Sequence, residues 1–572
     1  MPELSDALET LINQGHYFEA RSKAAEMIND STSMRSKQLY ALAVSKCGLP
    51  EAAMQFLEPI HKQFPDDPET AGILGGIYKE IFIKTKDQRY AILSKDTYLK
   101  NFTATKSYYT GINAATMSAI SGQSKQAQQI AAELLALLNP SSQDFWQTAT
   151  RAEALLISKD RVKAKEVYLQ ARNLVGTDWG KINSIYNQLW LLNHYLAVPN
   201  ELLKIFKPPV IAAFVGHMID HPSRTQSRFP ASIEHKVKEA LSNSITAINA
   251  KIGYCSLACG GDILFAEAML ETGGEVNIYL PFLKSDFLDA SVRFAGEQWV
   301  ERFEKLSNRF SVNYITHEPY DGYSDLFFLQ TGIIFGTATM RGKATHTKPH
   351  LVTILSGLDL KRKEGGTLDT LQLWPYPETI LNINPDNFNP TSQSNNRQEV
   401  PISIAPDKNK NRPVLYLIMA DFPNLPLAEK EICWKSVQAK IEIQSPLPRA
   451  LTWKGDHLLA AYVALEGTVA LCHTLVEMVS RFHKKDQVRI SLHVGPVQVG
   501  QQEVLGEKIE GNQVKILSQI HSFAACGEIY ASSQYSMELA LDLENYSIDY
   551  AGKFLPDGVP QSQEIFKIGF TK

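Results

Sequence analysis

Two aspartates in the last third of the chain have the type and the setting of metal ligands. Asp421 follows the apolar run 414–420, as it would at the end of a buried strand, and Asp456 follows a glycine that suits a hairpin tip. Paired carboxylates can hold the two divalent ions that phosphoryl transfer requires. Asp421 and Asp456 are therefore predicted ligands of Mg²⁺ or Mn²⁺ and candidate catalytic residues. The alternative is that they serve only a strand end and a turn.

The elements around these aspartates follow a regular order of strands and helices. A helix is expected near 461–482, then a strand at 488–493, a helix at 513–523 and a strand at 528–531. With "ADF", "KGDHLLAAY", "VRISLHVGPVQVG", "GNQVKILSQI" and "GEIYASS", residues 413–572 resemble the class III adenylate and guanylate cyclase domain. The resemblance implies an α+β fold, with Asp421 and Asp456 as its two metal ligands.

Several positions depart from the pattern of that family. The Asn and Arg that the family spaces four apart on the later helix fall on Lys515 and Gln519, and its purine-reading Lys and Asp fall on Thr452 and Lys508. An arginine acting on a phosphoryl transition state is worth roughly 10³ to 10⁵ in rate, which a neutral glutamine cannot supply. We expect a pseudoenzyme without ordinary turnover. The alternative is a class III nucleotidyl cyclase that converts ATP or GTP, with Lys515 partly replacing the missing cation.

Residues 206–383 alternate strand, loop and helix, which predicts a doubly wound parallel sheet. Glycine-rich turns follow two of the strands, at Gly216 and at 258–262. In such sheets ligands bind beyond the carboxyl ends of the strands, and the second turn would direct helix N-terminal amides at an anion. Arg224, in the loop after the first strand, could meet a phosphate bidentately. The simpler interpretation is that the glycines serve only tight turns.

The stretches "FVGHMID", "GYCSLACGGDILFAEAMLETGGEVNIYLPF" and "EGGTLDTLQLW" are similar to the SLOG group of Rossmann-like domains. This resemblance implies recognition of a nucleotide or an NAD-derived ligand. Glu267 also falls where some enzymatic members carry a catalytic glutamate. The predicted ligand-binding residues are Gly216, Arg224, Ser256, Gly260, Gly261, Asp262, Glu267, Gly365, Gly366 and Thr367.

Residues 1–205 carry apolar side chains at helical spacing, with almost no strand signal. Tyr40, Gly48, Ala52, Phe56 and Pro65 stand where a tetratricopeptide unit needs its packing positions and its break, which predicts an α-solenoid. "KNFTATKSYYTGINAATMSAISG" and "DFWQTATRAEALL" resemble the TRAF-binding tetratricopeptide region of apoptosis-signal-regulating kinases and its bacterial relatives. The resemblance implies a surface that binds a protein partner; the alternative is a helical domain that serves assembly alone.

Composition sets bounds on the remaining possibilities. A chain of 572 residues is too long to fold around a single hydrophobic core, so we expect three domains. A polar linker at 384–412 is expected to let the last domain move. A net charge of -4 offers no basic face for nucleic acid, and six scattered cysteines suit a cytoplasmic protein with free thiols. We expect no membrane span and no export signal. A homodimer is possible because cyclase-type domains pair.

Together these features predict an intracellular signalling protein. Its Rossmann-like domain would sense a nucleotide or NAD-derived ligand, and the helical repeats and pseudo-cyclase domain would relay the signal through protein contacts. The alternatives are a nucleotidyl cyclase and a structural adaptor.

Overall fold

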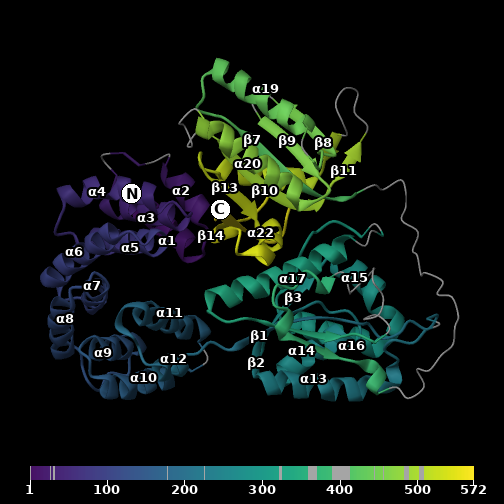
Figure 1. The fold of residues 1–572 in the computed structure, drawn as a ribbon, viewed down its shortest axis with the longest axis horizontal. Coiled ribbons are helices and arrows are strands. Elements are labelled where there is room, and N and C mark those ends of the chain that lie inside the picture. Colours follow the sequence, from purple (N-terminus) through teal and green to yellow (C-terminus); the bar gives the residue numbers. More distant parts are fainter. Residues whose placement is uncertain are drawn as a thin grey trace. The chain divides into compact units, whose positions relative to one another are not determined.

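The computed structural model describes residues 2–571 except 26–27, 30–31, 177, 225, 321, 323–324, 358–369, 389–411, 444, 455–456, 482–487 and 501–507. The chain is multidomain and largely helical, with one parallel and one mixed sheet (Figure 1). It divides into two compact units, residues 1–208 with 550–554 and residues 209–549 with 555–572. Among the described residues, no helix is long and apolar enough to cross a membrane.

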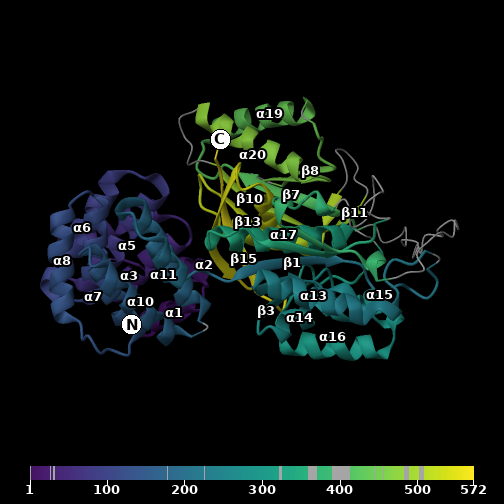
Figure 2. The ribbon, with the colours of Figure 1, turned by 60° about the horizontal axis from the view of Figure 1, so that its bottom comes forward.

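The first unit is built from helices that pack on their neighbours along the chain (Figure 2). Its turns are fixed locally: Gly48 has φ +81° between two helices, and Tyr40 and Phe56 bring their ring centroids to 4.8 Å across that pair. The helices are α1 (Pro2–Asn13), α2 (Tyr17–Ala25), α3 (Met34–Lys46), α4 (Pro50–Gln63), α5 (Pro68–Thr85), α6 (Gln88–Thr105), α7 (Tyr108–Ile120), α8 (Ser124–Leu137), α9 (Phe145–Ile157), α10 (Arg161–Val175), α11 (Trp179–Leu196) and α12 (Asn200–Ile205).

Aspartate N-caps begin many of these helices. In each case the carboxylate accepts a hydrogen bond from a backbone N–H of the first turn, which satisfies a donor that the helix itself leaves unpaired. The capping residues are Asp67, Asp87, Asp144, Asp160 and Asp178. The regular succession of capped helices is the helical-repeat architecture that the apolar spacing predicts.

The second unit begins with a six-stranded parallel sheet in the order β4-β3-β2-β1-β5-β6. Its strands are β1 (Val210–Gly216), β2 (Ala250–Cys255), β3 (Glu275–Leu280), β4 (Val312–Tyr314), β5 (His350–Ile354) and β6 (Ile380–Ile383). Its helices are α13 (Glu234–Ile248), α14 (Gly261–Glu271), α15 (Lys284–Ser291), α16 (Glu297–Arg309) and α17 (Asp325–Ala344). The chain runs outward from β1 to β4 and returns to place β5 beside β1, so the strand order reverses between β1 and β5.

Side-chain alternation along β1 separates the two faces of this sheet. Ala212 and Phe214 join the apolar core beneath α13, α14 and α16, whereas Ile211 and Ala213 face α17. α17 covers the opposite face together with Trp374 and its neighbours.

The unit continues with a seven-stranded sheet in the order β14-β15-β13-β10-β7-β9-β8. The elements are β7 (Val414–Asp421), α19 (Leu427–Ile443), β8 (Ala450–Lys454), β9 (His457–Tyr462), α20 (Leu465–Arg481), β10 (Arg489–Pro496), β11 (Gln498–Gly500), β12 (Lys508–Glu510), α21 (Asn512–Phe523), β13 (Ile529–Ser532), α22 (Ser533–Leu539), β14 (Tyr546–Phe554) and β15 (Gln563–Phe570). β9 extends to Tyr462, so the helix expected from about 461 begins only at Leu465.

α17 contributes apolar side chains to the cores of both sheets. Leu329 and Ile333 of α17, with Ile315 after β4, are buried among residues of the second sheet and its helices, whereas Ile334 and Ala338 pack on the parallel sheet. On the same face as Leu329 and Ile333, a Cβ added to Gly336 would lie 1.9 Å from the Met537 carbonyl oxygen of α22. The composition of 384–412 predicts independent movement of the last domain, yet α17 packs closely against it through these residues.

Candidate functional site

Asp421 lies in a row of polar side chains that three adjacent strands present to one face of the mixed sheet. The register pairs Asp421 with Arg489 of β10 on one side and with His457 of β9 on the other. Side chains alternate along a strand, so Ser491 and His493 point to the same face as Arg489. The intervening residues of β10 face the apolar core beneath α20.

Helix α21 covers this polar row. Gln513, Leu517 and His521 recur at intervals of four residues, so one face of the helix presents all three to the sheet. Leu517 packs with Leu415 and Leu417 of β7, and His521 continues the same face to the end of that strand. The amphipathic spacing of α21 is thus what brings an imidazole over Asp421.

The Asp421 carboxylate has close polar neighbours on three sides. Arg489 donates from Nε to Oδ1 at 2.9 Å and from Nη2 to Oδ2 at 2.5 Å. His457 Nε2 lies 3.3 Å from Oδ2, and His521 Nε2 lies 3.2 Å from Oδ1. Ser491 Oγ is 3.1 Å from the other ring nitrogen of His521. The group therefore combines one carboxylate, two imidazoles and one guanidinium.

Burial and charge set the protonation of this group. Burial alone would raise the pKa of Asp421, but His521 and Arg489 outweigh it and hold that pKa well below its usual range. Burial lowers the pKa of His521, against the pull of Asp421. Near neutral pH the site thus holds an ionised carboxylate beside a neutral, almost fully buried imidazole.

A second histidine continues the polar row toward the parallel sheet. His493 is within 2.7 Å of both Ser532 Oγ and Gln513 Oε1, and Gln513 Nε2 donates to Thr316 Oγ1 at 3.1 Å. Burial lowers the pKa of His493 to about 4, so this ring is neutral over most of the pH range. The row thus ends in contact with the loop after β4.

Other positions that align with functional residues of the cyclase family include Asp456, Lys515 and Gln519. Asp456 lies outside the described residues, although β8 and β9 pair on either side of it, with Lys454 opposite His457. Lys515 is exposed on α21, and Gln519 holds a buried Oε1 for which no hydrogen-bond partner is found. The described side chains that pair with the Asp421 carboxylate all do so through nitrogen atoms.

In the parallel sheet, the loops after β1, β2 and β5 meet at the carboxyl ends of the strands. His217 donates its backbone N–H to the Ile354 carbonyl at 3.0 Å, and its Nε2 accepts from the Ser356 backbone N–H at 3.3 Å. Gly261 donates to the His217 carbonyl at 3.0 Å. The contact between the first and last of these loops lies where the strand order reverses, which is the expected ligand position in such a sheet.

The glycines of these loops allow close backbone approach. Gly260 has φ +97°, and a Cβ there would lie 2.5 Å from the Ile219 backbone nitrogen. A Cβ on Gly216 or Gly261 would lie 2.7 Å from the Phe214 ring. Gly216, Gly260 and Gly261 are therefore brought together, and the space between them is filled by the chain itself.

The Asp262 carboxylate accepts hydrogen bonds from backbone amides in the β2–α14 loop and at the start of α14. The donors are the Ser256 backbone N–H, at 3.3 Å, and the amides of Ala258 and of Asp262 itself. Burial raises the pKa of Asp262 to about 7 despite these hydrogen bonds. The amide cluster predicted to hold an anion of a ligand thus already holds a carboxyl group of the protein.

The other predicted ligand-binding residues have separate surroundings. Glu267 forms a bidentate pair with Arg302, both contacts at 2.8 Å, and lies 3.3 Å from Lys238. Arg224 lies 3.5 Å from Asp220. Ser256 accepts from Gln330 of α17 at 2.8 Å. Gly365, Gly366 and Thr367 lie outside the described residues, in the segment that follows β5.

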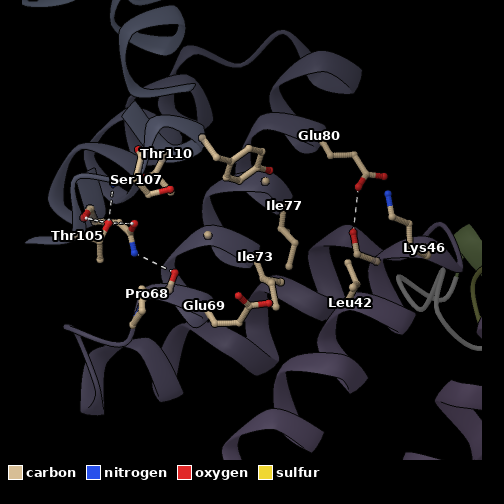
Figure 3. Close-up of a pocket in the computed structure, with 15 residues that line it drawn as sticks. Leu42, Lys46, Pro68, Glu69, Ile73, Ile77, Glu80, Thr105, Ser107 and Thr110 are labelled. Atoms are coloured by element: carbon tan, nitrogen blue, oxygen red, sulfur yellow. Dashed lines mark hydrogen bonds between the residues drawn. The ribbon is translucent and has the colours of Figure 1, made fainter. Parts of the chain in front are cut away.

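The helical unit carries a cavity of about 500 Å³ formed by α3, α5 and the α6–α7 region (Figure 3). Small residues open it, because Gly72 and Gly76 of α5 leave room beside Ser45. Glu80 accepts from the Ser45 hydroxyl at 2.9 Å, and Glu69 stands at the opposite end of the same helix. The cavity therefore combines apolar walls with carboxylates near both ends.

Comparison with known proteins connects the helical unit with a family. Residues 16–118 match the family model described as Tetratricopeptide Repeats-Sensor. No curated protein matches the chain. The tetratricopeptide-type repeat expected from the sequence is thus supported for this segment, and repeats of this type generally mediate protein–protein contacts.

Solved structures show weak similarity to parts of the chain. The adenylyl cyclase CyaB from P. aeruginosa matches at 14% identity and a TM-score of 0.24, covering 28% of this chain and 96% of that one. The guanylate cyclase domain of RhGC from Catenaria anguillulae in complex with GTP matches at 15% identity and 0.24, covering 28% and 98%. MamA MSR-1 C2 matches at 17% identity and 0.24, covering 30% and 94%.

The neighbours of Asp421 are residues that the sequence analysis did not select. Two signals for them are present in the sequence. Arg489, Ser491 and His493 are polar at every second position of an otherwise apolar strand, and His521 stands four residues beyond Leu517 on the buried face of α21. His457 directly follows the predicted ligand Asp456, where a hairpin must return.

Proposed function

We propose that this chain is an intracellular signalling or regulatory protein. In this proposal the parallel sheet binds a nucleotide or NAD-derived ligand, the tetratricopeptide-type repeats bind a protein partner, and the mixed-sheet domain relays the signal without fast turnover. The match of residues 16–118 to sensor repeats supports the regulatory role. The observation that carries the relay is the position of α17.

α17 contacts the predicted ligand loop and the mixed-sheet domain through different faces. Gln330 donates to the Ser256 hydroxyl at 2.8 Å, and Ile334, one helical turn further along, packs on the parallel sheet. A Cβ on Gly332 would come within van der Waals overlap of the Glu538 carboxylate of α22, which shows how closely the opposite face is packed. Movement of the Ser256 loop would therefore displace α17, and because α17 is closely packed against α22, α22 would have to move as well.

The surroundings of Asp421 support a relay over catalysis. Two-metal chemistry needs carboxylate oxygens that are free to bridge the ions. Arg489 uses one position on each oxygen of Asp421, which leaves fewer positions to bridge two ions, and Gln519 provides no cation for the transferring phosphoryl group.

We propose that the ligand binds at the reversal of strand order between β1 and β5. Asp262 already engages amides before and at the start of α14, so the proposed position is beside the His217–Ser356 contact. Full-chain protein is tested by thermal shift with ATP, GTP, NAD, ADP-ribose and cyclic nucleotides. A ligand at 100 times its Kd stabilises by about 2.7 kcal/mol.

His217→Ala should abolish the response, because it removes the contact between the two loops. His350→Ala is the matched control, since His350 begins β5 and so lies at the opposite end of that strand from the Ile354 contact. A flat response of the wild type across the panel, or an equal loss in both variants, contradicts ligand binding at this position.

The relay is tested by hydrogen exchange with the ligand that gives the thermal shift. Saturation should slow exchange in the β1–β5 loops and also in α22. In Gln330→Ala, exchange should still slow in the β1–β5 loops but should no longer slow in α22. Unchanged exchange in α22 of the wild type would reject the relay while leaving ligand binding intact. Cyclic nucleotide formed with Mn²⁺ and lost in Asp456→Ala would instead favour the cyclase alternative.

A further inference from the structure

Two histidine ring nitrogens lie close to the carboxylate oxygens of Asp421. The buried Nε2 of His521 is 3.2 Å from Oδ1. His457 Nε2 lies 3.3 Å from the other oxygen, Oδ2.

The spacing of these atoms matches that of ligands around a transition metal. One donor atom each from Asp421, His457 and His521 lies within 4.8 Å of the others. Metal–nitrogen and metal–oxygen bonds of about 2.0–2.1 Å in a tetrahedral site separate neighbouring ligand atoms by about 3.3 Å. The two nitrogen-to-carboxylate distances are close to this value but run to different oxygens of Asp421, and rotation of the half-exposed His457 ring would bring the three donor atoms around one ion.

The environment of His521 has the features of a metal-binding histidine. Ser491 Oγ lies 3.1 Å from Nδ1, so the serine can accept the Nδ1 proton and leave the Nε2 lone pair directed at Asp421. The side chain of His521 is only 4% exposed, so the ring is held in place by its surroundings.

Arg489 does not exclude a metal from this carboxylate. An ionised carboxylate offers about four lone-pair positions, and the guanidinium uses one on each oxygen. The remaining positions face His457 and His521. The neighbouring positive charge lowers the affinity for a cation, while the fork of hydrogen bonds fixes the orientation of the carboxylate.

We propose that Asp421, His457 and His521 bind one divalent transition ion of the zinc type. Two imidazoles and one carboxylate suit zinc and its neighbours, whereas Mg²⁺ prefers oxygen ligands, so this site differs in kind from the paired-aspartate magnesium site predicted from the sequence. The ion ties α21 to β7 and β9. Its fourth position opens to solvent beside His457, whose side chain is 44% exposed.

The test uses the full chain without an affinity tag, stripped of metal by a chelator. After dialysis against Zn²⁺, elemental analysis should give about one ion per chain in excess of the His457→Ala variant. Co²⁺ should give the visible absorption of a site with nitrogen ligands, and a large excess of Mg²⁺ should leave that absorption unchanged. Zn²⁺ should also raise the melting temperature of the wild type.

The variants separate ligation from folding. His457→Ala should lose the zinc and the Co²⁺ spectrum while keeping the metal-free melting temperature, because its ring is partly exposed. His473→Ala is the matched control, on the exposed side of α20 in the same domain, and should bind as the wild type does. Ser491→Ala should keep the stoichiometry and weaken zinc binding about 10- to 100-fold.

Three results would overturn the proposal: zinc in the wild type no higher than in His457→Ala, an unchanged Co²⁺ spectrum in that variant, or displacement of Co²⁺ by Mg²⁺. Equal losses in His457→Ala and His473→Ala would show adventitious binding by surface histidines and would overturn it as well.

Discussion

Asp262 and Asp421 are both buried aspartates, but their pKa values are shifted in opposite directions. Asp262 lies in the first turn of α14, beside the parallel sheet, and Asp421 ends β7 of the mixed sheet. Asp262 accepts backbone amides, and among the described residues no cationic side chain pairs with it; its pKa is raised to about 7. Asp421 meets Arg489 and two histidines, and its pKa is held far below the usual range. Hydrogen bonds from Arg489 and His521, which have no counterpart among the described side chains at Asp262, separate the two sites.

The difference indicates what each site can bind. The parallel sheet uses its own carboxyl group to occupy amides that would otherwise attract an anion. The mixed sheet keeps an ionised carboxylate beside neutral nitrogen donors, which suits a cation.

The largest effect that tests this contrast is expected from Asp421→Ala. Removing the carboxylate leaves Arg489 partly buried without its partner, so the free energy of unfolding should fall by about 3 kcal/mol at pH 7. Because the pKa of Asp421 is depressed on folding, its contribution is present above the unfolded value of about 3.9 and is lost as the pH falls below it. Urea denaturation at pH 7 and at pH 3 measures both effects.

Asp557→Ala, at an exposed turn of the same unit, serves as the control and should change stability by less than about 0.5 kcal/mol. A loss below about 1 kcal/mol in Asp421→Ala at pH 7 would mean that Arg489 does not depend on this carboxylate.

Asp262→Asn should have the opposite pH signature. The folded protein binds a proton at Asp262 up to about pH 7, whereas the unfolded chain releases it near pH 4, so this group makes stability fall as pH rises between those values. The slope it contributes reaches about 1.4 kcal/mol per pH unit. Asparagine should remove that slope, which melting curves from pH 4 to pH 8 will measure. An unchanged pH dependence would contradict the raised pKa.

Glu538 provides a second buried acid of the same kind in the mixed-sheet domain. Burial raises its pKa to about 7, and Tyr416 donates a hydrogen bond at 3.0 Å that only partly opposes the shift. Glu538→Gln should also flatten the fall in stability toward pH 7, and its effect should add to that of Asp262→Asn because the sites have separate partners. If only one of the two variants changes the pH dependence of stability, burial does not raise the pKa of both acids, and the explanation fails for the other.

The smallest effect is expected from Ser256→Ala. It removes the hydroxyl that accepts from Gln330 and leaves the Ser256 backbone amide on Asp262 intact. Stability should fall by about 1 kcal/mol with an unchanged pH slope. Should the slope change as well, the side chain of Ser256 would be part of the Asp262 site.

Local sequence signals predicted much of this architecture. Alternating strands and helices indicated the parallel sheet, and the polar linker separated it in sequence from a second, mixed sheet. Apolar spacing and the break at Gly48 indicated helical repeats. The glycine turns at 216 and 260–261 were expected to converge, and the described loops do meet.

The surroundings of each predicted side chain were harder to read. Asp262 was selected for its position in a turn, but that position does not reveal that its carboxylate folds back onto the amides. Glu267 and its partner Arg302 are 35 residues apart, and a sheet crossover brings them together. Asp421 meets Arg489 only through strand register and His521 only through the packing of α21, and neither contact leaves a local pattern.

The close packing of α17 restricts how its sequence can change. Each residue of an α-helix turns the chain by about 100°, so one residue inserted between Gln330 and Gly336 would carry the glycines away from α22 and direct larger side chains at the Met537 carbonyl. Related proteins that keep both sheets should therefore preserve the length of this helix and the glycines at positions 332 and 336.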